Sequence, residues 1–215
     1  MILMLYYAPG ASSLAAHIAL EEAAAPFDAT RVMLSSGEQR SDVYRAINPR
    51  ARIPALRTDD GVLTENIALL SYIANRFPAA ELLPRNDPWL LGKAYEQMSW
   101  MASTVHVAIA QIWRTERFTE DEQASAMLKQ DGRLHVQRFY GEIETVMGQE
   151  WLLGERYSVL DPYALVFWRW GERLGMEMAA FRNWAGHTKR MLERPAVIRV
   201  LERENAPDAP FTLGL

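Results

Sequence analysis

The chain of 215 residues contains no cysteine. This absence excludes disulfides, thiolate metal sites and any chemistry that depends on a thiol of the protein itself. The net charge is −4 at pH 7, so the sequence also lacks the excess of basic residues that binding to nucleic-acid phosphates requires. We therefore expect no nucleic-acid partner, and the cysteine-free composition is compatible with a cytoplasmic protein.

Four further features are absent from the sequence. No apolar run approaches the roughly 18 residues that cross a bilayer, and the first ten residues lack the basic segment of a signal peptide. The four histidines are widely spaced, and none forms a His-x-x-x-His pair. No glycine-rich nucleotide loop is present. We therefore expect no membrane association, no metal ion and no nucleotide.

The first 80 residues alternate between strand and helix patterns. Apolar residues 2–7 predict a buried strand, which Ala8-Pro9-Gly10 ends. Beyond this turn, we expect a helix over residues 14–24, a strand over 27–34, a loop with a short helix over 35–50, two strands joined at Asp60-Gly61, and a helix over 66–77. This order of elements predicts a small mixed sheet with helices on its faces.

The second part of the chain has helical patterns only. Three prolines lie between residues 78 and 88, so we place the domain boundary there. Helical periodicity predicts helices over residues 89–117, 121–148, 161–174 and 180–193, and a short helix after Pro195. The fold class is therefore α/β plus all-α, with an α/β domain over 1–80, a helical domain over 86–205 and an extended tail over 206–215.

The helix expected at residue 161 begins with a capping-box-like sequence, Ser158-Val159-Leu160-Asp161. We expect the Ser158 hydroxyl to accept a hydrogen bond from the Asp161 N–H. Pro162 removes one donor from the first turn, so loss of this cap should cost about 1 kcal/mol. Asp161 is thus interpreted as a cap and not as a catalytic residue.

A small binding site is predicted around Ile53-Pro54 and Glu65-Asn66. A cis peptide before Pro54 would leave neighbouring backbone groups free for a ligand. Glu65 and Asn66 open a helix, whose free N–H groups attract a carboxylate. One site can therefore bind both ends of an amino acid, with Glu65 on the ammonium group. The alternative is that Glu65 only interacts with the helix dipole.

Four segments in this order and at these spacings resemble the cytosolic glutathione transferases, and most closely their bacterial beta class: MLYYAPGASSLAAHIAL, NPRARIPAL, LTEN and GERYSVLD. The resemblance covers nearly the whole chain. It implies a thioredoxin-like domain that binds glutathione, a helical domain with an acceptor-substrate pocket, a homodimer, and glutathione as co-substrate. An amphipathic face on the helices over 66–77 and 89–117 is expected to supply the dimer contact.

The resemblance also implies roles for single residues at the glutathione site. The main chain of Ile53, beside a cis Pro54, should bind the cysteinyl backbone of glutathione. Glu65 and Asn66 should hold its γ-glutamyl group, although the family more often has serine at the second position. His106 matches a beta-class position near the thiol.

Two tryptophans are expected in the acceptor pocket. Trp170 matches a family position that lines this pocket, and we place Trp113 there as well.

Of the histidines other than His106, His17 is expected to pack in the core, and His135 and His187 are expected on the surface.

Ser12 is the important departure from the resemblance. The beta class has its characteristic cysteine at this position, so a mixed disulfide with glutathione is not expected here. A hydroxyl can instead donate a hydrogen bond to the glutathione thiolate. Ser12 and Ser13 are the candidates for this role, with helix capping as the alternative for both, and Tyr7 is the runner-up.

The predicted reaction is attack by the bound glutathione thiolate on a small hydrophobic electrophile. Two alternatives keep the same fold. One is a glutathione-dependent isomerase or peroxidase, and the other is a non-catalytic binding protein.

Overall fold

The structure is a computed structural model in which residues 2–205 are described. Its sheet has four strands in the order β2-β1-β3-β4: β1 (Leu3–Tyr7), β2 (Phe27–Arg31), β3 (Ala55–Thr58) and β4 (Gly61–Thr64). Strand β1 runs parallel to β2 and antiparallel to β3, and β3 and β4 are antiparallel. The expected mixed sheet is confirmed, although β2 ends three residues before the predicted strand does.

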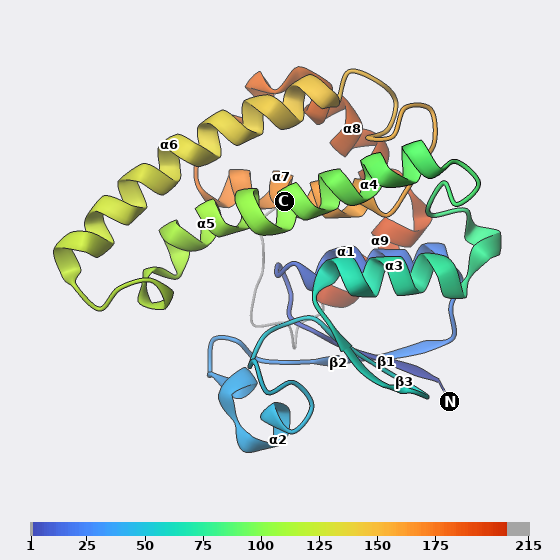
Figure 1. Cartoon of the computed structure of the whole chain (residues 1–215), viewed down its shortest axis with the longest axis horizontal. Coiled ribbons are helices and arrows are strands. Elements are labelled where there is room, and N and C mark those ends of the chain that lie inside the picture. The colour runs from blue at the N-terminus through green and yellow to red at the C-terminus, as the bar shows by residue number, and fades with distance from the viewer. Residues whose placement is uncertain (1, 206–215) are drawn as a thin grey trace.

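Helices cover both faces of this sheet (Figure 1). Side chains of β1 alternate between the faces. Tyr7 packs with α1 (Ser13–Glu22) and α3 (Asn66–Arg76), which lie between the sheet and the helical part. Tyr6 packs on the other face with Tyr44 of α2 (Asp42–Arg45). Both tyrosines of β1 are therefore buried, each in its own cluster.

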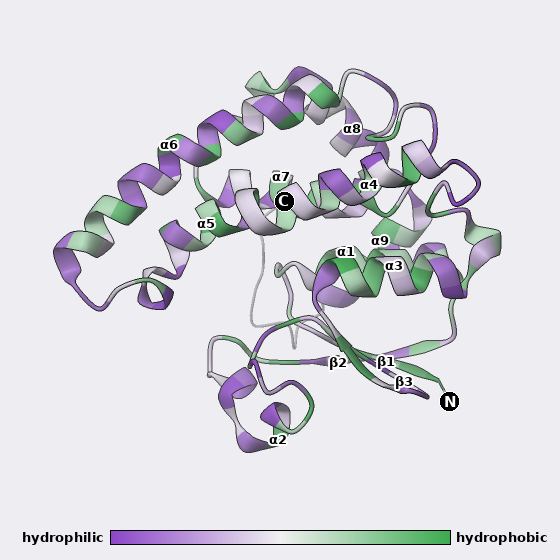
Figure 2. Cartoon of the chain, viewed as in Figure 1, coloured by the Kyte–Doolittle hydropathy of each residue, from purple (hydrophilic) through white to green (hydrophobic). Residues whose placement is uncertain are grey.

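The second part of the described chain is helical, as expected. Its helices are α4 (Pro88–Trp100), α5 (His106–Trp113), α6 (Glu122–Val146), α7 (Leu160–Arg173), α8 (Arg182–Leu192) and α9 (Pro195–Glu204). Figure 2 shows that hydrophilic residues predominate along α6. We propose that the boundary between the two parts lies between α3 and α4.

The single helix predicted over residues 89–117 is interrupted twice. A π-helical turn, Met101–Val105, joins α4 to α5. The α-helix then ends at Trp113, because Arg114 has φ −139° and ψ 44°, outside the helical region. Thr115–Arg117 form a short 3-10 helix. The predicted helix was therefore too long at its C-terminal end.

Helix α7 joins the two parts of the molecule. Residues 160–171 are all buried, and the helix contacts both α1 and α8. Its aromatic side chains belong to one hydrophobic core that also includes Tyr7 and the inner side of α1. Within residues 2–205, no helix combines the length and the apolar character that a bilayer crossing demands.

Two predictions around the start of α7 were wrong in part. Asp161 is fully buried, and its Oδ2 accepts from the Ser158 N–H at 2.7 Å, so it is a cap. The Ser158 hydroxyl, however, accepts from the Leu160 N–H (3.2 Å) and not from that of Asp161. His187 is fully buried and not on the surface, because its Nε2 pairs with Asp161 Oδ1 at 2.9 Å. The predicted tail over 206–215 lies outside the described residues.

Candidate functional site

Ser12 and Ser13 follow β1 at the turn that opens α1. The Ser13 hydroxyl accepts from the N–H of Ala8 and donates to its carbonyl, both at 3.1 Å, so it is committed to the turn. Ser12 occupies the N-cap position, but its side chain does not cap the helix and makes no hydrogen bond with residues 2–205. The capping alternative is therefore wrong for both serines, and Ser12 alone offers a free hydroxyl.

Tyr7 lies beneath this turn. It is 6% exposed, and its ring packs against that of His17 with 4.9 Å between centroids. Burial, and then the negative charge of Glu204, raise the pKa of Tyr7. His17 is fully buried, as expected of a packing residue. The phenol of Tyr7 therefore stays protonated near neutral pH, and the Tyr7 side chain is buried in the core.

The Ile53–Pro54 peptide is cis, as expected. Two side chains anchor the loop before it, because the Arg52 carbonyl accepts from the Tyr44 hydroxyl at 2.8 Å and from the Asn48 amide at 2.7 Å. Ile53 is half-buried at the end of this loop. The backbone just before Ile53 is thus fixed by the Tyr44 and Asn48 side chains.

Glu65 and Asn66 stand at the start of α3, next to Ser12. The Asn66 amide donates to the Ser12 carbonyl at 2.9 Å, which brings the two ends of the predicted site together. Glu65 has φ 73° and ψ 127°, a strained backbone that costs about 1–3 kcal/mol. No side chain caps α3, so its N-terminal N–H groups are available to a carboxylate. Side chain and helix end can therefore act on one ligand.

Gly10, two residues before Ser12, is held by two helices of the second part. The Trp170 indole Nε1 donates to its carbonyl at 2.8 Å, and the Gly10 N–H donates to Glu204 Oε2 at 3.3 Å. Gly10 has φ 69°, which favours glycine. Glu204 also pairs with His17 Nδ1 at 3.1 Å. Sequence reasoning missed Glu204, because no local pattern relates it to a turn 194 residues away.

His106, Trp113 and Trp170 form an aromatic cluster beside this turn. Trp170 lies 4.8 Å from His106 and 5.8 Å from Trp113 between ring centroids, in both cases edge to face. Trp170 therefore holds the Gly10 carbonyl and forms part of this cluster. Burial, followed by the positive charges of Arg117 and Arg52, lowers the pKa of His106 to about 4. His106 is thus neutral at pH 7.

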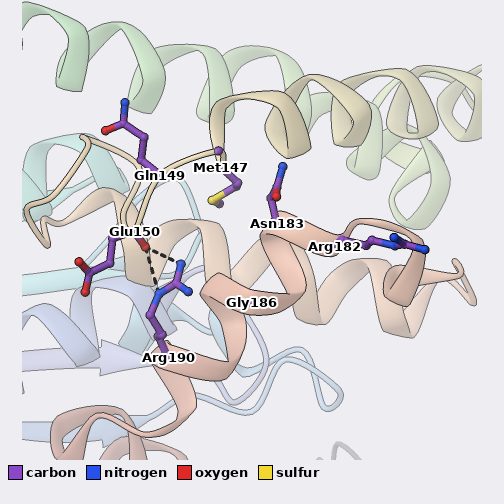
Figure 3. Close-up of a pocket in the computed structure, with 8 residues that line it drawn as sticks. Met147, Gln149, Glu150, Arg182, Asn183, Gly186 and Arg190 are labelled. Atoms are coloured by element: carbon purple, nitrogen blue, oxygen red, sulfur yellow. Dashed lines mark hydrogen bonds between the residues drawn. The ribbon is translucent and has the colours of Figure 1, made fainter.

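Two surface hollows lie elsewhere in the helical part. One of about 390 Å³ is formed by the loop after α6 and by α8, where Arg190 donates twice to the Glu150 carbonyl (Figure 3). The other, of about 430 Å³, lies between α5, α6 and the segment after α7. None of the sequence-predicted site residues lines either hollow. Among residues 2–205, no group of three or more His, Asp or Glu side chains is placed to hold a metal ion.

Comparison with known proteins agrees with this fold and site. Residues 1–75 match the glutathione S-transferase N-terminal domain, and residues 101–195 match the glutathione S-transferase C-terminal domain. The chain belongs to the glutathione S-transferase family. Its fold, an N-terminal thioredoxin-like domain followed by a helical domain, is the fold of this family.

Individual relatives include proteins of the beta class. A glutathione transferase homologue from Sulfitobacter, solved with bound glutathione, is 34% identical, with TM-score 0.90 and coverage of 94% of this chain and 98% of its own. The beta class glutathione S-transferase of Sphingomonas chungbukensis is 31% identical, with TM-score 0.82 and coverage of 94% and 98%. Glutathione S-transferase GstA of Escherichia coli O157:H7 is 29% identical over 93% of this chain and 98% of its own length.

Proposed function

We propose that the protein transfers small hydrophobic electrophiles to glutathione, using Ser12 to stabilise the glutathione thiolate. The observation that carries the proposal is the Asn66–Ser12 hydrogen bond. This bond brings the Ser12 backbone to the uncapped start of α3, and in this proposal Glu65 and the backbone there take the γ-glutamyl group. The cysteinyl part of glutathione would then pair with the backbone of Ile53.

The reaction needs the thiol to lose its proton before attack. A hydrogen bond to a charged group contributes about 1.5–3 kcal/mol, and a helix N-terminus about 0.3–1 kcal/mol. Together they lower a thiol pKa from about 8.5 by roughly 1–3 units, since one unit corresponds to about 1.36 kcal/mol. Ser12 at the start of α1 supplies both effects.

The S–H proton leaves to solvent in this proposal. His106 has a pKa of about 4, so it is too weak a base to hold the proton at pH 7. The thiolate then forms the S–C bond, and the leaving group departs with its electron pair. In an addition to an activated alkene, the carbanion formed takes a proton from water. The protein contributes thiolate stabilisation and proximity of the two reactants.

Calorimetric titration with reduced glutathione tests the first site. We expect binding in the micromolar to low-millimolar range, and we expect Glu65→Ala to abolish it. Glu65→Gln keeps the shape and removes the charge, so it isolates the contact with the ammonium group. Glu155→Ala, at an exposed loop position, is the control. Absence of glutathione binding by the unaltered protein would contradict the proposal and favour the non-catalytic alternative.

Thiolate absorbance of bound glutathione identifies the residue that contacts the thiol. Ser12→Ala should raise the pKa of the bound thiol by roughly 1–2 units, since it removes the charged hydrogen bond. Ser13→Ala should leave that pKa near the wild-type value, because the Ser13 hydroxyl already exchanges two hydrogen bonds with Ala8. Tyr7→Phe should do so because the Tyr7 side chain is only 6% exposed. An unchanged pKa in all three variants would sink the role assigned to a protein hydroxyl.

The assembly and location of the protein belong to the same proposal. We expect a cytoplasmic homodimer whose contact includes α3 and α4. Trp89, on the first turn of α4, supports this, because 78% of its surface is exposed and tryptophan is enriched at interfaces between proteins. Sedimentation of the wild type and of Trp89→Gln tests the expectation, and a monomeric wild type would contradict it.

A further inference from the structure

Three arginines gather on one side of the aromatic cluster, and we call Arg52, Arg114 and Arg117 the arginine group. Arg114 donates through Nη1 to the Trp113 carbonyl at 3.4 Å. Burial is the main factor that opposes protonation of His106. The positive charges of Arg117 and Arg52 oppose it as well. The arginine group therefore borders the space beside His106 and Trp113.

The members of the arginine group come from two distant parts of the chain. Arg52 immediately precedes Ile53 on the glutathione side. Arg114 and Arg117 belong to the segment that directly follows Trp113 at the end of α5, and the Arg117 N–H donates to the Arg114 carbonyl at 3.0 Å. A further guanidinium, that of Arg173 at the end of α7, lies 4.9 Å from the centre of the Trp113 ring. Positive charge thus converges on this place from both domains.

No carboxylate of residues 2–205 forms an ion pair with the arginine group, whereas other arginines of the described chain have such partners, among them Arg194 with Glu22. Burial and then the like charges of Arg52 and Arg114 lower the pKa of Arg117, and only Glu116 opposes them among the acidic side chains. The chain carries a net charge of −4, so a basic composition does not explain this gathering. All three side chains are exposed, and a ligand in solution can reach them.

Glutathione alone does not balance this charge. Its γ-glutamyl carboxylate belongs at the start of α3. Its glycyl carboxylate supplies a single negative charge, and Arg52, beside Ile53, is the nearest candidate in the sequence to bind that charge. Arg114 and Arg117 remain on the side of the half-buried Trp113. A flat apolar surface next to guanidinium groups suits a ligand that is aromatic at one end and anionic at the other.

We propose that the electrophile accepted by this protein is an aromatic compound that carries a carboxylate, with the ring against Trp113 and the carboxylate on Arg114 and Arg117. The inference rests on the proposed transferase function and narrows its substrate class. Because the arginines are exposed, the attraction acts through partly screened charges and weakens as salt is added.

A matched pair of electrophiles tests the proposal: 4-(chloromethyl)benzoate and its neutral methyl ester. Each kcat/KM is divided by the rate of the same reaction with glutathione in the absence of protein. We expect the corrected value for the acid to exceed that for the ester by roughly five- to tenfold at low salt, the size of a few exposed charge-assisted contacts. The preference should shrink as ionic strength rises from about 0.02 to about 0.5 M.

Arginine variants assign the preference to its source. Arg114→Gln and Arg117→Gln should each reduce the acid-to-ester ratio, and the double variant should bring it near one. Arg138→Gln is the matched control, because Arg138 is exposed on α6 and pairs with Glu142 at 3.7 Å. Arg52→Gln should raise the KM for glutathione more than it changes the ratio. An acid-to-ester ratio of one in the wild type would overturn the proposal, although transferase activity itself would stand.

A second readout applies if neither electrophile is turned over, which would contradict the transferase function. Calorimetry then compares S-(4-carboxybenzyl)glutathione with its methyl ester. Tighter binding of the acid, lost in the double variant, supports an anion site beside Trp113. Equal affinities, or no binding of either conjugate, overturn it.

Discussion

At the scale of the residue, Ser12 and Ser13 show how neighbouring side chains of one type come to differ. The Ser13 hydroxyl exchanges two hydrogen bonds with Ala8, whereas the Ser12 hydroxyl makes none with residues 2–205 and only the Ser12 carbonyl accepts from the Asn66 amide. The sequence could limit the choice to these serines and Tyr7, but not decide it. The hydrogen bonds of each serine depend on how the turn folds back on Ala8, which no local pattern specifies.

His106 is the residue whose pKa leads to a prediction about stability. The native pKa is about 4, while an unfolded histidine has a pKa of about 6.5. Below pH 6.5 the unfolded state therefore binds a proton that the native state refuses, and stability is lost as the pH falls from 6.5 to about 4. This contribution is fully present above pH 6.5.

We expect His106→Gln to reduce that loss. Thermal melting at pH 7 and pH 5 should show a smaller drop in Tm for the variant than for the wild type. His135→Gln is the control, because His135 is exposed on α6. An equal drop in the variant and the wild type would contradict the low pKa of His106.

At the scale of the element, α7 depends on one buried carboxylate at its start. Asp161 accepts from the N–H groups of Leu152 and Ser158, from the Ser158 hydroxyl, and pairs with His187. The sequence predicted that Asp161 caps α7, but not that it also binds Leu152 and His187. Leu152 and His187 lie 9 and 26 residues away, beyond any local pattern.

Replacing Asp161 should therefore cost more than an ordinary cap. Asp161→Ala leaves several buried donors without an acceptor, each worth about 1–3 kcal/mol, so we expect a loss of about 3 kcal/mol or more in the free energy of unfolding. Ser158→Ala should cost only about 1 kcal/mol. Urea unfolding of both variants measures this difference, and similar costs for the two would show that Asp161 acts as a simple cap.

Other elements were predictable to different degrees. The order of strands and helices follows from periodicity and turn residues, since these are local properties. The interruption of the predicted helix over 89–117 does not, because a π-helical turn such as Met101–Val105 keeps helical residue types while shifting the phase of the helix. The cis peptide before Pro54 was expected from the resemblance, whereas no local pattern relates Arg52 to Arg114 and Arg117, which the fold brings into range of one another.

At the scale of the whole molecule, Glu204 connects the two parts. It is 2% exposed, accepts from the Gly10 N–H and pairs with His17, so α9 holds the turn that carries Ser12. A buried pair that loses one partner is costly, because the other charge or donor stays behind without compensation. The Glu204 side chain therefore couples the turn to the helical part, in addition to the Trp170 indole that binds the Gly10 carbonyl.

We expect Glu204→Ala to lower both stability and turnover. The free energy of unfolding should fall by about 3 kcal/mol, and kcat should fall because the Ser12 turn is held less firmly. Glu204→Gln retains an acceptor for the Gly10 N–H and should recover part of the lost kcat. Glu202→Ala, exposed on the same helix, is the control. A stable variant with wild-type kcat would show that the turn keeps its shape without α9.

The hydrogen bond between Gly10 and Glu204 also affects the order in which the site forms during synthesis of the chain. The ribosome makes the turn at the beginning of the chain, and its N-terminal part can start to fold while the rest is still being added. The acceptor for the Gly10 N–H arrives 194 residues later. A nascent chain that has already formed its sheet therefore still lacks one contact of the turn that carries Ser12, and the proposed thiol site is completed only once α9 has left the ribosome.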